Sequence, residues 1–153
     1  MAEVTVSRAV ASLCGVGLCP LAPGTAGSLV ALGAGAGLLH LNFWALLGGV
    51  LLAVIGGLWA IRAEMAAGDA GWIVIDEVAG QWIALLGLAG LTLPGVLAAF
   101  LLFRLFDIAK PGPVGWVDRR HDAVGVMGDD VVAGAMAALT LVAVRAVWPE
   151  LLA

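Results

Sequence analysis

The chain has 153 residues, of which 63% are hydrophobic and 12% charged, and its formal net charge is −4. A soluble domain is usually about 45–50% apolar and about 25% charged, so this composition favours a membrane protein. The negative charge argues against nucleic acid as a partner, and the length predicts a single domain over residues 1–153.

A helix needs about 20 mostly apolar residues to cross a bilayer. Five stretches meet or approach this length: residues 24–41, 43–61, 72–91, 95–108 and 131–148. Residues 4–18 are modestly amphipathic, and no signal peptide is expected because Glu3 precedes Arg8. The sequence therefore predicts an all-α fold, a polytopic membrane helix bundle of four to five membrane helices plus an N-terminal interfacial or packed helix.

Charged residues avoid two of the predicted turns and gather in the others. Residues 40–42 and 91–95 contain no Lys, Arg, Asp or Glu. The other connections carry Arg62, Glu64, Asp69, Lys110, Asp118, Arg119, Arg120, Asp122, Asp129 and Asp130. Basic residues mark the cytoplasmic side, so these connections and the N-terminus are predicted to be cytoplasmic and the C-terminus to lie opposite. All polar motifs then meet at one membrane face.

Two adjacent acids, Asp76 and Glu77, interrupt the apolar stretch IVIDEVAGQW. A charge at the centre of a membrane helix costs about 2.5–3.5 kcal/mol on insertion scales, so both acids require partners. One interpretation is an ion pair with Arg104 or Lys110. The other is a pair that binds a divalent metal or transfers a proton.

A second acid pair, Asp129 and Asp130, occurs in MGDD before the last apolar stretch. These residues either cap the following helix or provide further metal ligands. Two carboxylate pairs on one membrane face suit a hard cation such as Mg²⁺, which prefers oxygen ligands.

Two further motifs contain groups that suit an anion. In FRLFDIAKPGP, Arg104, Asp107 and Lys110 follow one another at i,i+3 spacing, which predicts either a self-neutralising stripe or a phosphate clamp held by Asp107. In PLAPGTAGS, Thr25 and Ser28 either cap a helix or contact an oxyanion near free backbone N–H groups.

Together these motifs resemble the phosphatidylglycerophosphatase A family. The resemblance covers about residues 17–134 and rests on GLCPLAPGTAGSLVAL, WIVIDEVAGQWIAL, FRLFDIAKPGPVGWVDRR and GVMGDDVVAG, in this order. It implies a magnesium-dependent, multi-pass phosphatase of the bacterial inner membrane. Such an enzyme hydrolyses phosphatidylglycerophosphate to phosphatidylglycerol and phosphate in phospholipid biosynthesis.

With this resemblance, an active site is expected at the cytoplasmic face. The expected Mg²⁺ ligands are Asp76, Glu77, Asp129 and Asp130, and these four with Asp107 are the expected catalytic residues. The expected contacts to the substrate phosphate are Gly24, Thr25, Ser28, Arg104, Lys110 and Arg119. Metal-activated water and an aspartyl-phosphate intermediate both remain open as mechanisms.

Two other classes of membrane protein also place acids among apolar helices. A small ion or proton transporter would use buried carboxylates as its pathway, but it would more naturally place them at mid-membrane and often shows internal repeats. A CDP-alcohol phosphotransferase would require an acidic motif with a spacing that is absent from this sequence. The expected partners are the lipid substrate and the bilayer, and the sequence makes no prediction of oligomeric state.

Overall fold

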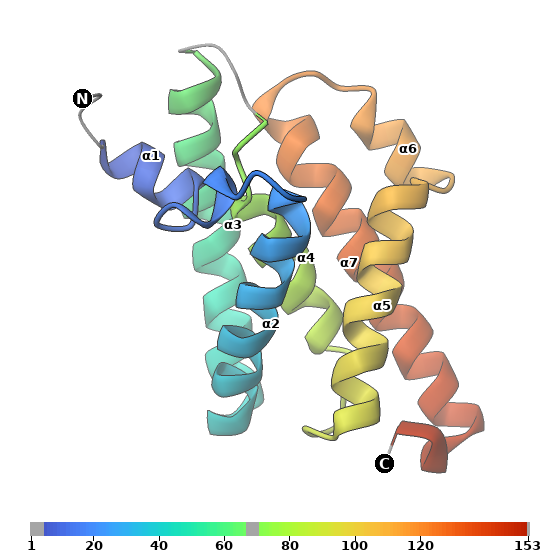
Figure 1. Cartoon of the computed structure of the whole chain (residues 1–153). Coiled ribbons are helices and arrows are strands. Elements are labelled where there is room, and N and C mark those ends of the chain that lie inside the picture. Colours follow the sequence, from blue (N-terminus) through green and yellow to red (C-terminus); the bar gives the residue numbers. More distant parts are fainter. Residues whose placement is uncertain (1–4, 67–70, 153) are drawn as a thin grey trace.

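The computed structural model describes residues 5–66 and 71–152, and every regular element in these residues is helical (Figure 1). In chain order the elements are α1 (Val6–Ala11), the 3-10 helix η1 (Val16–Leu18), α2 (Pro23–Leu41), α3 (Phe43–Met65), α4 (Ile75–Leu85), α5 (Leu93–Ala109), α6 (Pro113–Asp118), α7 (Ala123–Val147) and the 3-10 helix η2 (Pro149–Leu152). The predicted all-α class is confirmed. Glu3, Val4 and Asp69, which carried sequence predictions, lie outside the described residues.

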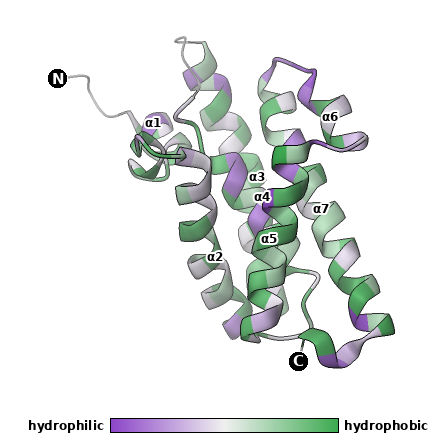
Figure 2. Ribbon diagram, turned by 45° about the vertical axis from the view of Figure 1, so that its right-hand side comes forward, coloured by the Kyte–Doolittle hydropathy of each residue, from purple (hydrophilic) through white to green (hydrophobic). Residues whose placement is uncertain are grey.

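The longer helices lie side by side, with α1 and α6 at one end of the bundle and η2 at the other (Figure 1). The first residues of α2, α4 and α7 and the last residues of α5 lie at the end that carries α1 and α6. Hydrophilic residues gather there, whereas hydrophobic residues cover most of the remaining helix length (Figure 2). We call this the polar end. The four motifs thus meet at one end of the bundle, as the charge pattern predicts.

Within the part of the chain that the structure describes, three helices, α2, α3 and α7, are long and apolar enough to cross a membrane. The other two predicted spans are shorter, since α5 has 17 residues and α4 has 11. At 1.5 Å per residue, α4 is about 16 Å long, roughly half the hydrocarbon thickness of a bilayer. The prediction of one helix over residues 72–91 is therefore wrong in extent.

Contacts within the protein explain why α4 can be short. Before the helix, the N–H of Val74 donates to the carbonyl of Ala11 at 2.9 Å. After it, Arg145 Nη1 donates to the carbonyl of Gly87 at 3.3 Å. Non-helical backbone at membrane depth is tolerated where the protein surrounds it and satisfies its polar groups. Arg145 thus satisfies a backbone carbonyl in the turn that follows α4.

The short helix α4 forms the centre of the bundle. Eight of its eleven residues are buried, and it packs against α7, α2, α3 and α5. The closest approach is to α7, where a Cβ on Gly134 would collide with the carbonyl of Gly80 and a Cβ on Gly80 would lie 2.7 Å from the carbonyl of Asp130. Small residues allow this approach, as is typical of membrane helices.

The last helix begins earlier than the sequence predicts, at Ala123 rather than at residue 131. Asp122 is its N-cap and accepts from the N–H of Gly125 at 2.8 Å. Arg120 hydrogen-bonds to Asp122 and lowers the pKa of this carboxyl to about 2, so the cap stays ionised above that pH. Asp129 and Asp130 lie almost two turns inside the helix, so they do not cap it and the metal-ligand alternative is the one left open.

Two prolines separate α5 from α6. The helix α5 ends at Ala109, before Pro111, because proline cannot continue a helix. Pro113 instead occupies the first turn of the short helix α6, which the sequence analysis missed. Between them, Lys110 adopts a left-handed conformation with φ of 45°. This conformation is uncommon for a residue with a side chain and redirects Lys110 relative to α5.

The glycine contact between α4 and α7 gives a stability prediction. Gly134→Leu places a branched side chain against the backbone of Gly80, and such overpacking costs about 1–3 kcal/mol or more. We expect a clear drop in Tm, measured by thermal unfolding in detergent micelles. Gly33→Leu is the matched control, because a Cβ at Gly33 meets nothing within 4 Å. Equal Tm values for the two variants would contradict the proposed packing constraint.

Candidate active site

A cleft of about 390 Å³ opens at the polar end of the bundle. The residues that line it are Met65, Asp76, Glu77, Asp107, Lys110, Asp118, Arg120, His121, Gly125, Val126, Asp129 and Asp130. Six of these are carboxylates, and they include all five that the sequence predicts to be catalytic. Larger hollows beside η2 and between α2 and α3 are lined mainly by apolar side chains, so the charged chemistry belongs to the smaller cleft.

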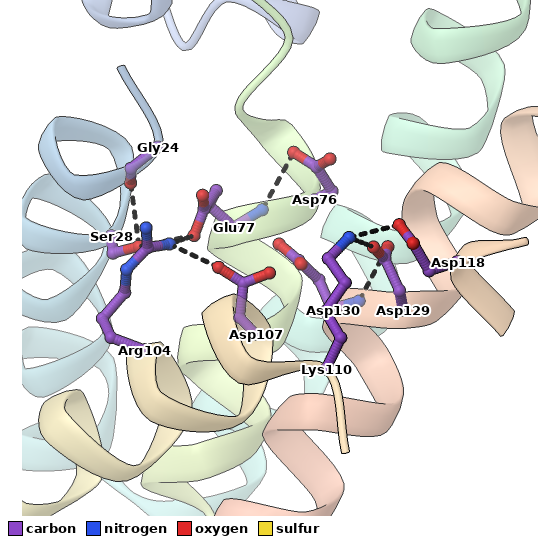
Figure 3. Close-up of polar contacts among 10 residues, drawn as sticks. All are labelled: Gly24, Ser28, Asp76, Glu77, Arg104, Asp107, Lys110, Asp118, Asp129 and Asp130. Carbon is purple, nitrogen blue, oxygen red and sulfur yellow. Dashed lines mark hydrogen bonds and ion pairs between the residues drawn. The ribbon is translucent and has the colours of Figure 1, made fainter. Parts of the chain in front are cut away.

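Arg104 connects three helices at one side of the cleft (Figure 3). Its Nη1 lies 2.5 Å from Glu77 Oε2 on α4 and 2.8 Å from Asp107 Oδ2 on α5. Ser28 on α2 donates to Glu77 Oε2 at 2.6 Å. A Cβ at Gly24 would collide with Glu77 Oε1, so the glycine leaves room for this carboxylate. The ion pair considered for Glu77 is therefore present, and so is the i,i+3 pair of Arg104 with Asp107.

Lys110 forms a second bridge, between α6 and α7 (Figure 3). Its Nζ donates to Asp129 Oδ2 at 2.8 Å and forms a closer ion pair with Asp118. Partial burial opposes the charged form, but the hydrogen bonds to the two acids raise the pKa of Lys110 above its usual value. The same contact lowers the pKa of Asp118. The sequence predicted that Lys110 would share a face with Asp107, but the left-handed backbone directs it toward α7.

Three carboxylates converge between the two bridges. One oxygen each from Asp107, Asp129 and Asp130 lies within 4.8 Å of those of the other two. Asp130 is 4% exposed, and its Oδ2 is buried without a hydrogen-bond partner among the described residues. A buried carboxylate oxygen of this kind normally requires a partner. The three acids therefore fit a hard cation that prefers oxygen ligands.

Asp76 lies at the first turn of α4, beside Glu77 and above Asp130 in the view of Figure 3. Its Oδ1 accepts from the N–H of Glu77 at 3.0 Å, and it forms no ion pair within the described residues. Asp76 therefore remains available to a cation, water or substrate in the cleft. Glu77 is different, because Arg104 and Ser28 already engage its Oε2.

The structure brings together only some of the predicted phosphate contacts. Lys110 lines the cleft, and Arg104 lies directly behind Glu77 and Asp107. Ser28 is fully buried and contacts Glu77 instead. Thr25 and Arg119 are not among the residues that line the cleft, so their predicted roles stay predictions.

Sequence reasoning assigned no role to Asp118 or His121, which line the cleft together with Arg120. Asp118 is eight residues from Lys110, and only the short helix α6 brings the two together. Their place in the charged stretch WVDRRHD is the sequence feature that could have indicated them as site residues.

The charge of the cleft limits what it can bind. Of its six carboxylates, Asp118 and Asp129 pair with Lys110. Glu77 and Asp107 pair with Arg104. Arg120 is engaged by Asp122 outside the cleft. The carboxylates therefore exceed the cationic groups, and an anion would meet net repulsion unless further positive charge were bound. A divalent cation would supply that charge and permit a phosphate group to enter.

Comparisons with known proteins agree with this chemistry. The chain is 37% identical to phosphatidylglycerophosphatase A of Escherichia coli (strain K12) over 148 residues, which cover 88% of this chain and 81% of the relative. It is 38% identical to a putative phosphatidylinositol-3-phosphatase of Bacteroides thetaiotaomicron, over 86% of this chain and 88% of the relative. A phosphatidylglycerophosphatase A of Haemophilus influenzae is 40% identical over 54% of this chain and 52% of its own length.

No solved structure matches the chain. The profile of the family described as phosphatidylglycerophosphatase A matches residues 9–145, which include every residue of the cleft. The chain therefore belongs to the phosphatidylglycerophosphatase A family and is a hydrolase of phosphoric monoesters.

Proposed function

We propose that this membrane protein is a magnesium-dependent phosphatase that hydrolyses phosphatidylglycerophosphate to phosphatidylglycerol and phosphate. The proposal places the reaction at the cytoplasmic face of the bacterial inner membrane, as a step of phospholipid biosynthesis. The observation that carries it is the convergence of Asp107, Asp129 and Asp130 at the polar end of a bundle of apolar helices. Family membership supports the substrate class.

Asp107, Asp129 and Asp130 are the carboxylates best placed to hold Mg²⁺, with Asp76 alongside them. This set exchanges Glu77 of the sequence prediction for Asp107, because Asp107 has a carboxylate oxygen within 4.8 Å of those of Asp129 and Asp130. When bound, the metal would supply positive charge to the phosphate and lower the pKa of a bound water.

The remaining polar groups have separate roles in the proposal. Arg104 offers a planar guanidinium beside the metal ligands and Lys110 offers a point charge, so both would neutralise the phosphate. Glu77 and Ser28 hold Arg104 in place. Asp76, which lacks an ion-pair partner within the described residues, is the carboxylate best placed to accept a proton from the attacking water.

The position of the cleft suits a lipid substrate. The cleft opens at the polar end of the bundle, so a phosphate at the membrane surface can reach its acids while the acyl chains stay in the bilayer. A transporter pathway is disfavoured by the same placement, because its acids would be expected nearer mid-membrane.

One relative suggests a second substrate. The putative phosphatidylinositol-3-phosphatase covers most of this chain, so phosphatidylinositol 3-phosphate is the alternative phosphomonoester lipid. Both lipids carry a terminal phosphate on a polyol head group, which is the feature that the charged cleft would bind.

Substrate and metal are tested together by phosphate release from a panel of lipids. We expect the purified protein in detergent to release phosphate fastest from phosphatidylglycerophosphate, more slowly from phosphatidylinositol 3-phosphate and phosphatidic acid, and only with Mg²⁺ present. Removal of Mg²⁺ by a chelator should abolish release and its return should restore it. Equal rates with chelator would contradict the metal requirement, and a faster rate on the phosphoinositide would favour the second substrate.

The metal ligands are tested by amide substitutions of similar shape. Loss of an outer-shell partner alone commonly lowers metal affinity or activity about 10–100-fold, so Asp107→Asn, Asp129→Asn and Asp130→Asn should each reduce phosphate release by at least about 100-fold. Glu150→Gln in η2, at the opposite end of the bundle, should leave the rate unchanged. Release at the wild-type rate by Asp129→Asn and Asp130→Asn would contradict the assigned site.

A further inference from the structure

Lys110 is the only lysine in the chain, and its backbone conformation is unusual. Its φ of 45° lies in the left-handed region, which glycine occupies at most helix ends of this type. A side chain in this region is strained by about 1–2 kcal/mol, and such strain persists only where surrounding contacts fix it. Here the contacts are the ion pairs with Asp118 and Asp129.

These ion pairs engage a proposed metal ligand. Asp129 Oδ2 accepts from Lys110 Nζ at 2.8 Å, and Asp129 Oδ1 accepts from the N–H of Asp130 at 3.0 Å. Both oxygens of this carboxylate are therefore engaged within the protein. An ammonium and a divalent cation that bind one carboxylate repel each other strongly at such short range. Lys110 and Mg²⁺ should accordingly oppose each other at Asp129.

A second carboxylate offers Lys110 an alternative position. Asp118 lies on α6 at the rim of the cleft, and its side chain is 44% exposed against 11% for Asp129. The flexible four-carbon stem of lysine allows Nζ to leave Asp129 while it stays near Asp118. In that position the ammonium would face the opening of the cleft, where a substrate phosphate would enter.

We propose that Lys110 and the divalent cation exchange at Asp129, so that cation binding releases the Lys110 ammonium to the phosphate. This inference rests on the proposed function and adds a coupling to it. The exchange lowers the affinity for Mg²⁺ alone and raises the affinity for phosphate once Mg²⁺ is bound. Because binding free energies are linked, phosphate must raise the affinity for Mg²⁺ by the same factor.

The first experiment observes Lys110 directly in the full-length protein. Lysine labelled with ¹³C at Cε gives one side-chain NMR signal, because the chain has a single lysine. We expect Mg²⁺ to shift this signal, and inorganic phosphate to shift it further only when Mg²⁺ is present. A signal that is unchanged by saturating Mg²⁺ would overturn the exchange. This measurement requires no variant, so it stands even if a substitution at Lys110 prevents folding.

The second experiment measures affinities by titration calorimetry. Lys110→Met removes the competing ammonium, and we expect it to raise the affinity for Mg²⁺ at least tenfold, which corresponds to about 1.4 kcal/mol. Arg120→Met is the matched control, because Arg120 also lines the cleft but pairs with Asp122 rather than with a proposed ligand. Its effect on Mg²⁺ affinity should be less than about threefold. In Lys110→Met, inorganic phosphate should raise the affinity for Mg²⁺ by a smaller factor than in the wild-type protein, because only the direct attraction between Mg²⁺ and phosphate remains.

The outcomes separate the exchange from the function on which it rests. Suppose that the wild-type protein binds Mg²⁺ and releases phosphate. If Lys110→Met then binds Mg²⁺ no more tightly than the wild type, the exchange is overturned and the proposed function stands. Equal gains in Lys110→Met and Arg120→Met would also overturn it, since only the general charge of the cleft would then matter. Wild-type protein that neither binds Mg²⁺ nor releases phosphate would overturn both.

Discussion

The contact of Arg104 with Glu77 and Asp107 is the interaction on which the polar end of the bundle depends. It joins α4 to α5 across a region from which water is largely excluded, and Ser28 adds α2 to the same group. Each of these groups would be costly to bury alone, and removal of one partner from a buried pair commonly costs about 3–5 kcal/mol. The pair therefore fixes where α4 begins and holds Asp107 toward α7.

The glycine contact between α4 and α7 completes the arrangement. Gly80 and Gly134 let the two backbones meet, and Asp130 lies on α7 one turn before Gly134. Larger residues would separate these helices and move Asp129 and Asp130 away from the first turn of α4. The apolar packing in the membrane thus sets the distances between the carboxylates at its edge.

Much of this arrangement could be predicted from the sequence, because each long helix has a clear apolar pattern and the acids stand out against it. The turns at residues 40–42 and 91–95 carry no charge, and this pattern predicted that the charged motifs meet at the other end of the bundle. The extent of α4 could not be predicted, since its flanking residues are also apolar and the tertiary contacts of Val74 and Gly87 beside its two ends do not follow from the local pattern. The partners of Lys110 were missed because a left-handed residue breaks the i,i+3 geometry.

The cost of burying a polar group without a partner explains why so many acids are found together in so apolar a chain. Hydrophobic helices supply no polar partner below the cleft, and both amide atoms of the fully buried Gln81, one turn beneath Glu77, lack a hydrogen-bond partner among the described residues. Charges that face the cleft must therefore balance one another or bind a cation from the aqueous side. Arg104 and Lys110 balance part of the negative charge. The remainder favours cation binding first, and a phosphate group can then enter a cleft that would otherwise repel it.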